Sequence, residues 1–205
     1  MARTEERQAR SKETPVVGGL PDVPGILVAM RLSPGLALHL RGLADELLVK
    51  EFPGSTLTRA ERELIATAVS AGNDCFYCMD SHGAFAAELL QRANVPGIDA
   101  VVDGVKVGDV DGLDGKMRAL VHLARTVQRS ARELTRAEVE AAIAAGASDG
   151  DTQLAVLIAA AFCMYNRMVD GLRANTPTSA DAFRLRAAEI AEHGYSDARV
   201  QAIPG

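Results

Sequence analysis

Two cysteines and one histidine are spaced so that a single helical face would carry all three. Cys75 and Cys78 are three residues apart, and His82 follows four residues after the second cysteine. At about 100° per residue, their side chains fall within an arc of about 60°. A pair of thiols can form a disulfide, and an imidazole can accept or donate a proton near neutral pH. The spacing therefore predicts a thiol redox protein, and an enzyme.

The reactive form of a cysteine is its thiolate, so a redox site must lower the pKa of one thiol. The first turn of a helix does this through its unsatisfied N–H groups and its dipole, and both cysteines would lie in that turn. Asp74 opposes the effect with a neighbouring negative charge. His82 could pair with the Cys78 thiolate or carry its proton. Glu63, on the preceding helix, could orient His82 or hold a proton.

Three other interpretations compete with this one. Cys75, Cys78 and His82 could bind zinc, although a fourth ligand is not obvious and no second cysteine pair is present. The two cysteines could be buried packing residues. From its spacing alone, Glu63 would be a charge on the surface of a helix. The third cysteine, Cys163, lies in the most apolar segment and is predicted to be a buried packing residue.

The composition predicts a soluble, all-helical protein. Of its 205 residues, 48% are hydrophobic, 24% are charged and only 4% are aromatic, and tryptophan is absent. Alanine and leucine are abundant, which favours helices that pack closely through small side chains. The net charge is −5, and no block of Lys and Arg lies beyond the first twelve residues. Nucleic acid is therefore not an expected partner.

Neither a membrane segment nor an oxidising compartment is expected. The first 15 residues are charged and lack the apolar stretch of a signal peptide. The longest apolar run, 154–165, is too short to cross a bilayer. Three cysteines are too few for a disulfide scaffold in a chain of this length. We therefore expect a cytoplasmic protein, in which a Cys-x-x-Cys pair is catalytic or metal-binding more often than structural.

Capping and breaking residues divide the chain into helices, and no segment shows convincing strand alternation. We expect a disordered tail over 1–14 and a single compact, all-helical domain over 15–205. Irregular chain is expected over 16–30, and the main loop over 94–115, which is rich in Gly and Asp. The predicted helices cover about 34–50, 58–71, 75–93, 114–129, 135–145, 151–172 and 176–194.

A short sequence also occurs twice in the chain. The sequence Leu-Thr-Arg-Ala-Glu begins at Leu57 and again at Leu134, 77 residues later, and each copy would open a short helix that leads into a longer one. This predicts an internal two-fold helical repeat in which only the first half keeps the cysteine motif. The long helix of the second half is apolar nearly all round, so it should be central or lie at a subunit interface.

One spacing pattern resembles the signature of the alkylhydroperoxidase D-like (AhpD-like) proteins, which belong to the carboxymuconolactone decarboxylase superfamily: Glu63-x11-Cys75-x2-Cys78-x3-His82. The stretch 62–82 is similar to the subgroup of uncharacterised peroxidase-related proteins. A looser resemblance covers about 20–186. Ser70, Asn73 and Asn166 are among the residues that carry it.

The resemblance implies roles for the four motif residues. In the characterised relatives the second cysteine attacks the peroxide and the first resolves the sulfenic acid, which carries over to Cys78 and Cys75. The histidine and the glutamate form a proton relay, which carries over to His82 and Glu63. One departure is that AhpD proteins have a further histidine just before the second cysteine, where this chain has Tyr77. A phenol is a poorer base than an imidazole at neutral pH, so the relay is expected to differ.

The resemblance also implies an all-helical AhpD-like fold, assembly into trimers or hexamers, and thiol peroxidase activity without a cofactor or metal. The expected partners are a small hydroperoxide and an external dithiol reductant of the lipoyl or thioredoxin-like type, with no nucleic acid and no membrane. Two other functions stay open. A lactone decarboxylase or isomerase of the same superfamily would give the paired cysteines no role. A redox sensor or interaction module would use the disulfide to change its assembly.

Overall fold

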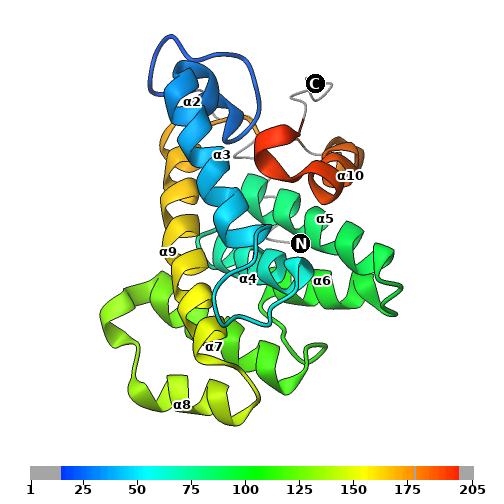
Figure 1. The fold of residues 1–205 in the computed structure, drawn as a ribbon. Coiled ribbons are helices and arrows are strands. Elements are labelled where there is room, and N and C mark those ends of the chain that lie inside the picture. Colours follow the sequence, from blue (N-terminus) through cyan, green and yellow to red (C-terminus); the bar gives the residue numbers. More distant parts are fainter. Residues whose placement is uncertain (1–14, 178, 199–205) are drawn as a thin grey trace.

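The computed structural model describes residues 15–177 and 179–198, and all regular structure in these ranges is helical (Figure 1), which confirms the all-helical prediction. The predicted tail, 1–14, lies outside the described residues. The helices are α2 (Leu27–Leu32), α3 (Pro34–Leu48), α4 (Arg59–Gly72), α5 (Phe76–Arg92), α6 (Ile98–Val107), α7 (Gly115–Ser130), α8 (Arg136–Ala144), α9 (Asp149–Gly171) and α10 (Ala180–Asp197), with a short 3-10 turn at Ala131–Glu133.

Helix α9 runs along the molecule beside α2 and α3 (Figure 1), and α4 and α7 pack against it. Leu154, Ile158 and Phe162 follow one another at four-residue spacing and are almost completely buried. By length and composition alone α9 could cross a membrane, but the core helix of a soluble protein meets the same test. The apolar composition of this helix predicted either a central position or a position at a subunit interface, and the structure shows the central position. A subunit interface stays a prediction.

Helices α4 and α5 carry the cysteine motif. Helix α4 begins with the predicted capping box, in which the Thr58 side chain accepts a hydrogen bond from the Glu61 N–H and the Glu61 carboxylate accepts one from the Thr58 N–H. Most of α4 is buried because α5, α7 and α9 pack around it. The chain then turns through Asp74, which has the left-handed φ of 54°. This turn places Cys75 directly before the first residue of α5.

The second copy of the repeated sequence also forms its capping box, between Thr135 and Glu138, at the start of α8. Helix α8 has 9 residues, against 14 in α4, and it packs chiefly against α7. Helix α4, by contrast, packs closely against the helix that follows it. The two halves therefore share their opening turn and differ in how the following helices pack.

A buried carboxylate ties the start of α9 to the segment before α4. The Asp151 side chain accepts five hydrogen bonds, from Ser55 Oγ (2.8 Å), the Thr56 N–H (2.6 Å), Thr56 Oγ1 (2.9 Å), the Leu57 N–H (3.2 Å) and the Ser148 N–H (3.0 Å). Burial acts to raise the pKa of this carboxyl, but the hydrogen bonds outweigh it and hold the pKa well below its ordinary value. Asp151 is thus a structural anchor of the bundle.

The predicted loop over 94–115 was wrong, because α6 forms within it. The high content of Gly and Asp hides an apolar face in which Val102 and Val105 recur at helical spacing. Both side chains are buried where α6 packs against α4 and α5. Tertiary packing therefore supplies the stability that the local sequence lacks.

The ends of the fold also differ from the prediction. The segment 16–30, predicted to be irregular, already contains the start of α2 at Leu27. Helix α10 begins after Ser179, whose hydroxyl oxygen caps it by accepting a hydrogen bond from the Asp181 N–H, rather than near residue 176. It also continues past the predicted end, through a kink at Gly194.

Candidate functional site

A partly buried polar network fixes the junction at which the two cysteines lie. The Cys75 N–H donates to the Ser70 carbonyl (3.0 Å), and the Ser70 hydroxyl accepts a hydrogen bond from Asn166 (3.1 Å). Asn73 donates to Asn166 (2.8 Å) and accepts from Gln128 (2.8 Å). Ser70, Asn73 and Asn166 all belong to the wider family resemblance. In this chain they join α4, α7 and α9 around the turn that leads into α5.

The two cysteines lie in different environments although only two residues separate them. Cys75 is completely buried at the N-cap of α5 and does not line the neighbouring cavity, whereas Cys78 lines it from the first turn. Contact with the Cys78 thiol, together with burial, raises the pKa of the Cys75 thiol far above its ordinary value. Cys75 therefore keeps its proton, and Cys78 is the sulfur that a ligand in the cavity can reach.

Glu63, His82 and Tyr195 form a buried chain of hydrogen bonds. Glu63, only 1% exposed, places Oε2 2.7 Å from His82 Nδ1, and its Oε1 accepts a hydrogen bond of 2.7 Å from the Tyr195 hydroxyl. The Tyr195 oxygen also lies 3.3 Å from His82 Nδ1.

The donors and acceptors of this chain follow from its chemistry. A carboxylate can only accept hydrogen bonds, so the contact with Glu63 assigns the ring proton to His82 Nδ1 and leaves Nε2 to face the cavity. Burial, followed by the charge of Glu63, raises the pKa of Tyr195 well above its ordinary value. The Tyr195 hydroxyl therefore stays protonated and acts as a donor to Glu63.

A kink near the end of α10 brings Tyr195 into this chain. Gly194 has a φ of 74° and a ψ of −166°, a conformation open mainly to glycine. The N–H groups of the next two residues, Tyr195 and Ser196, donate to the Asp45 carboxylate on α3 at 2.6 and 2.9 Å. A Cβ at position 194 would lie 2.8 Å from Asp45 Oδ1. The absence of a side chain therefore permits the close approach that docks Tyr195.

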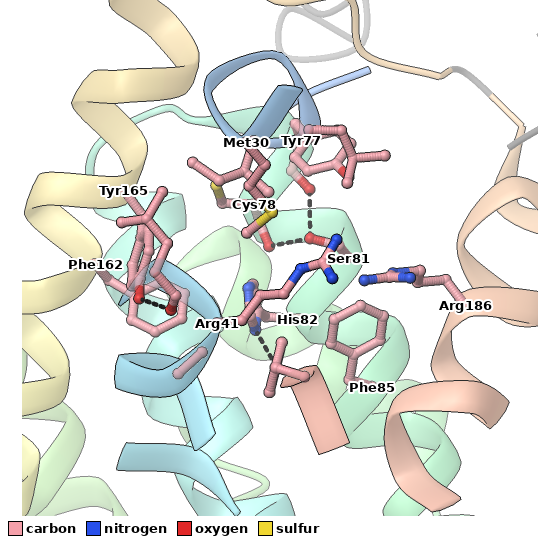
Figure 2. A pocket seen from close by; sticks show the side chains of 15 residues that line it. Met30, Arg41, Tyr77, Cys78, Ser81, His82, Phe85, Phe162, Tyr165 and Arg186 are labelled. Carbon is pink, nitrogen blue, oxygen red and sulfur yellow. Dashed lines mark hydrogen bonds between the residues drawn. The ribbon is translucent and has the colours of Figure 1, made fainter. Parts of the chain in front are cut away.

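Cys78 and His82 share one cavity, whose volume is about 590 Å³ including the part open to solvent. Figure 2 shows the imidazole beneath Cys78, with both side chains directed into this space. The rings of Phe162 and Phe85 meet the imidazole edge-on, with centroid distances of 4.5 and 5.2 Å. These contacts fix the plane of the ring, so the side of His82 that does not contact Glu63 is held toward the cavity.

The structure brings together the four residues that the sequence singled out. Glu63 is buried, so its interpretation as a surface charge is wrong. In the ranges that the structure describes, no three His, Cys, Asp or Glu side chains are placed to hold a metal ion, and the zinc interpretation therefore has no ligand set. The catalytic roles of Cys78, Cys75, His82 and Glu63 stay predictions at this point.

Tyr77, which stands where the AhpD proteins have a histidine, lines the cavity but is not part of the hydrogen-bonded chain. Its ring packs edge-on against Phe183 at 5.7 Å and fills the space beside Gly25, where a Cβ would lie 2.2 Å from ring atoms. Burial raises the pKa of this phenol, so Tyr77 is neutral. The position serves as part of the cavity wall.

The sequence did not predict that Tyr195 belongs to the site, and the prediction that Cys163 is buried was wrong. Nothing in the spacing of Tyr195, 113 residues after His82, pointed to the site, and the only local signal was the glycine before it. Cys163 is half-buried rather than buried, and it accepts a hydrogen bond from Asn73 Nδ2 at 3.6 Å. It lies at the polar junction described above and does not line the cavity.

Comparisons with known proteins identify the relatives of this chain. A family model described as the carboxymuconolactone decarboxylase family matches residues 26–92, the part that contains Glu63, both motif cysteines and His82. The solved structure of an uncharacterised peroxidase-related protein from Ralstonia eutropha JMP134, described as an alkylhydroperoxidase AhpD core, is 30% identical over 80% of each chain, with a TM-score of 0.64.

Two further solved structures are similar. An uncharacterised peroxidase-related protein from Silicibacter sp. TM1040 is 25% identical over 76% of this chain and 77% of its own, with a TM-score of 0.63. A protein of unknown function from Agrobacterium tumefaciens is 18% identical over 74% of this chain and 97% of its own, with a TM-score of 0.60, and shares the fold. No protein of curated function matches the chain.

Proposed function

This chain belongs to the AhpD-like proteins of the carboxymuconolactone decarboxylase superfamily, and from that premise we propose that it is a thiol-dependent hydroperoxidase. The main support is the arrangement around Cys78, a thiol that faces a cavity together with His82, whose other ring nitrogen contacts a buried carboxylate. A protonatable group beside the reactive sulfur, oriented in turn by a third group, is what nucleophilic catalysis by a thiol requires.

In the proposed cycle Cys78 first gives its thiol proton to His82 Nε2, and the resulting thiolate attacks the distal oxygen of a hydroperoxide, so that the O–O bond breaks. Cys78 becomes a sulfenic acid, and the departing alkoxide takes a proton from His82 Nε2 to leave as an alcohol. Glu63, which accepts hydrogen bonds from His82 and from Tyr195, stabilises the positive charge of the imidazolium before the proton is transferred. Tyr195 is a positioning residue, because it contacts Glu63 rather than the cavity sulfur.

Cys75 completes the cycle. Its thiol condenses with the Cys78 sulfenic acid, releases water and forms a Cys75–Cys78 disulfide. Because Cys75 does not line the cavity but contacts the Cys78 sulfur, it is placed to resolve the sulfenic acid rather than to attack the substrate, and its thiol proton leaves with the released water. An external dithiol of the lipoyl or thioredoxin-like type then reduces the disulfide and is itself oxidised. From the sequence and the family resemblance we also propose a cytoplasmic protein that assembles into three or six copies.

Thiol titration tests this assignment directly. The reduced protein has three cysteines, and one equivalent of cumene hydroperoxide should leave a single free thiol, that of Cys163. In Cys75→Ser, the same treatment should consume one thiol and leave a sulfenic acid that dimedone traps. Cys78→Ser should keep both of its thiols. Consumption of thiols by Cys78→Ser at the wild-type rate would contradict the choice of nucleophile.

Turnover separates an enzyme from its alternatives. With dithiothreitol as reductant, wild type should consume the peroxide continuously, and His82→Gln should lower kcat/KM by about 100-fold or more, the usual contribution of a general acid. A disulfide that forms without continuous turnover would instead indicate a redox sensor. Full activity of the Cys75→Ser, Cys78→Ser double variant on a lactone would indicate a decarboxylase of the same superfamily.

A further inference from the structure

Helix α10 is held at its kink by two charged side chains from different helices. In an unbroken helix the Tyr195 N–H would donate to the carbonyl of Ala191, four residues earlier. At the kink this N–H donates to Asp45 on α3, while the Ala191 carbonyl accepts a hydrogen bond of 2.8 Å from Arg59 Nη1 on α4. Arg59 Nη2 donates to the neighbouring carbonyl, that of Ile190, at 2.7 Å. A cation therefore binds the carbonyl side of the kink, and an anion binds the N–H side.

The chemistry of the two groups suits these positions. The last carbonyls of a helical segment carry a partial negative charge, and a guanidinium group offers several N–H donors in one plane. Both contacts of Arg59 are partly buried, and a hydrogen bond from a charged donor is roughly twice as strong as a neutral one. Arg59 thus fixes the straight part of α10 against the start of α4.

Arg59 and Glu63 hold α10 from the same face of α4. They are four residues apart, so their side chains project side by side, one turn after the other. Arg59 binds the α10 backbone just before the kink at Gly194. Glu63 accepts the hydrogen bond of the Tyr195 hydroxyl just after it. Because α4 fixes the spacing of these two anchors, Arg59 determines where the phenol lies relative to the carboxylate.

The repeated sequence provides the same pair of residues without this contact. Arg136 and Glu140 of the second copy correspond to Arg59 and Glu63, and Arg136, like Arg59, is the first residue of its helix. Both residues of the second copy are exposed, on a helix that packs chiefly against α7. The chain therefore contains its own matched control for the effect of Arg59.

We propose that Arg59 is a positioning residue of the redox site, which holds the kinked end of α10 so that Tyr195 donates to Glu63. That hydrogen bond fixes one carboxylate oxygen and leaves the other directed at His82. The inference rests on the proposed function, because Glu63 and His82 act in that cycle. Arg59 does not line the cavity, so it contacts neither the reacting sulfur nor the substrate and acts through Tyr195.

The kinetic test is a double-mutant cycle with cumene hydroperoxide and dithiothreitol. Arg59→Gln and Tyr195→Phe should each lower kcat/KM by about tenfold, because a supporting group of the site is misplaced. The double variant should lose no more than either single variant, since both changes break the same link. Arg59→Lys keeps a charged donor but not the planar pair of donors, and it should recover part of the activity.

Arg136→Gln changes the net charge by the same amount and should stay within about twofold of wild type, as expected for a surface substitution. Losses that multiply in the double variant would overturn the proposal, because Arg59 and Tyr195 would then act separately. An equal loss in Arg136→Gln would also overturn it, because the effect would then come from the net charge.

Tyrosine fluorescence reports the same contact without any turnover. The chain has three tyrosines and no tryptophan, so its emission comes from phenols alone. A phenol that is hydrogen-bonded to a carboxylate emits weakly, because its proton moves to the carboxylate in the excited state. Arg59→Gln should therefore raise the emission of the reduced protein as Tyr195 leaves Glu63, and Arg136→Gln should not. In the Tyr195→Phe background, Arg59→Gln should leave the emission unchanged.

The two measurements separate this inference from the proposed function. If wild type consumes no peroxide but the emission changes as stated, the hydroperoxidase assignment fails and the role of Arg59 in holding Tyr195 stands. If Arg59→Gln emits like wild type, or changes the emission equally in the Tyr195→Phe background, the inference is refuted whatever the activity. Should Arg59→Gln fail to fold, Arg59→Lys replaces it with a smaller rise in emission, and wild-type emission of that variant refutes the inference.

Discussion

Replacing Tyr195 with phenylalanine removes one oxygen atom from the buried chain and leaves the Glu63 carboxylate with His82 as its remaining partner among the described residues. A hydrogen bond to a charged group contributes about 1.5–3 kcal/mol to the free energy of unfolding. We therefore expect Tyr195→Phe to be less stable than wild type by about 2 kcal/mol. For a chain of this length, that corresponds to a fall in Tm of about 4–8 °C.

Tyr165 supplies a matched control for this measurement. Its hydroxyl is also buried and donates a hydrogen bond of 2.7 Å, but the acceptor is the neutral carbonyl of Leu40. Tyr165→Phe should therefore lose only about 1 kcal/mol. Urea denaturation at pH 7, with both variants and wild type compared at equal slope, gives the three free energies of unfolding. A Tyr195→Phe loss no larger than that of Tyr165→Phe would refute a charged Glu63 acceptor.

The pH dependence provides a second, independent check. The pKa of Tyr195 is raised by burial and by Glu63, so its phenol form is favoured in the folded state. The stability that it contributes is therefore fully present below its unfolded pKa of about 10 and is lost as the pH rises above that value. The difference between wild type and Tyr195→Phe should be constant from pH 7 to 9 and should narrow above pH 10. A difference that grows with alkaline pH would contradict the assigned donor.

Three other variants have clear expectations. Gly194→Ala should lose about 2 kcal/mol or more of stability, because the residue has a positive φ and a Cβ would crowd Asp45, and circular dichroism melting measures the loss. Asp151→Asn should lower the free energy of unfolding by about 3 kcal/mol at pH 7. The difference from wild type should shrink below pH 4, because the low pKa of Asp151 then contributes less to the stability of the folded state. Urea denaturation at pH 7 and at pH 3 tests both expectations. Cys163→Ala should keep peroxidase kcat/KM within twofold, and a large loss would mean that Cys163 acts on the site.

The local sequence predicted the helices that begin with capping boxes and the turn between α4 and α5. Thr58 with Glu61 and Thr135 with Glu138 form the expected hydrogen bonds because each box depends on residues only three positions apart. Helix α6 was missed for the opposite reason. Its stability comes from Val102 and Val105 against other helices, and this burial is not visible in its own glycine-rich sequence.

In the candidate site, too, local contacts could be predicted from the sequence and long-range contacts could not. Cys78 and His82 lie on α5 and Cys75 is the residue at its N-cap, so spacing alone placed them together. Tyr195 joins Glu63 from 132 positions further along the chain. Such a contact depends on how α10 docks, and a single tyrosine has no spacing that signals it.

The sequence also did not predict that two arginines would line the cavity. Arg41 and Arg186 are separated by most of the chain, and each alone resembles an ordinary helix arginine. Only the packing of α3 against α10 brings them to one cavity.

Because the site depends on α10, the protein can lose its activity while the rest of the helical bundle stays folded. Helix α10 packs against α3 and α5 and follows irregular chain at 172–177 and 179, whereas the rest of the core is built from earlier helices. A protease cut in that connection, or partial opening of the last helix, would remove Tyr195 and Arg186 without dismantling the contacts among α4, α7 and α9. Preparations with intact helical spectra could therefore be inactive, and limited proteolysis would reveal them before any change in melting temperature.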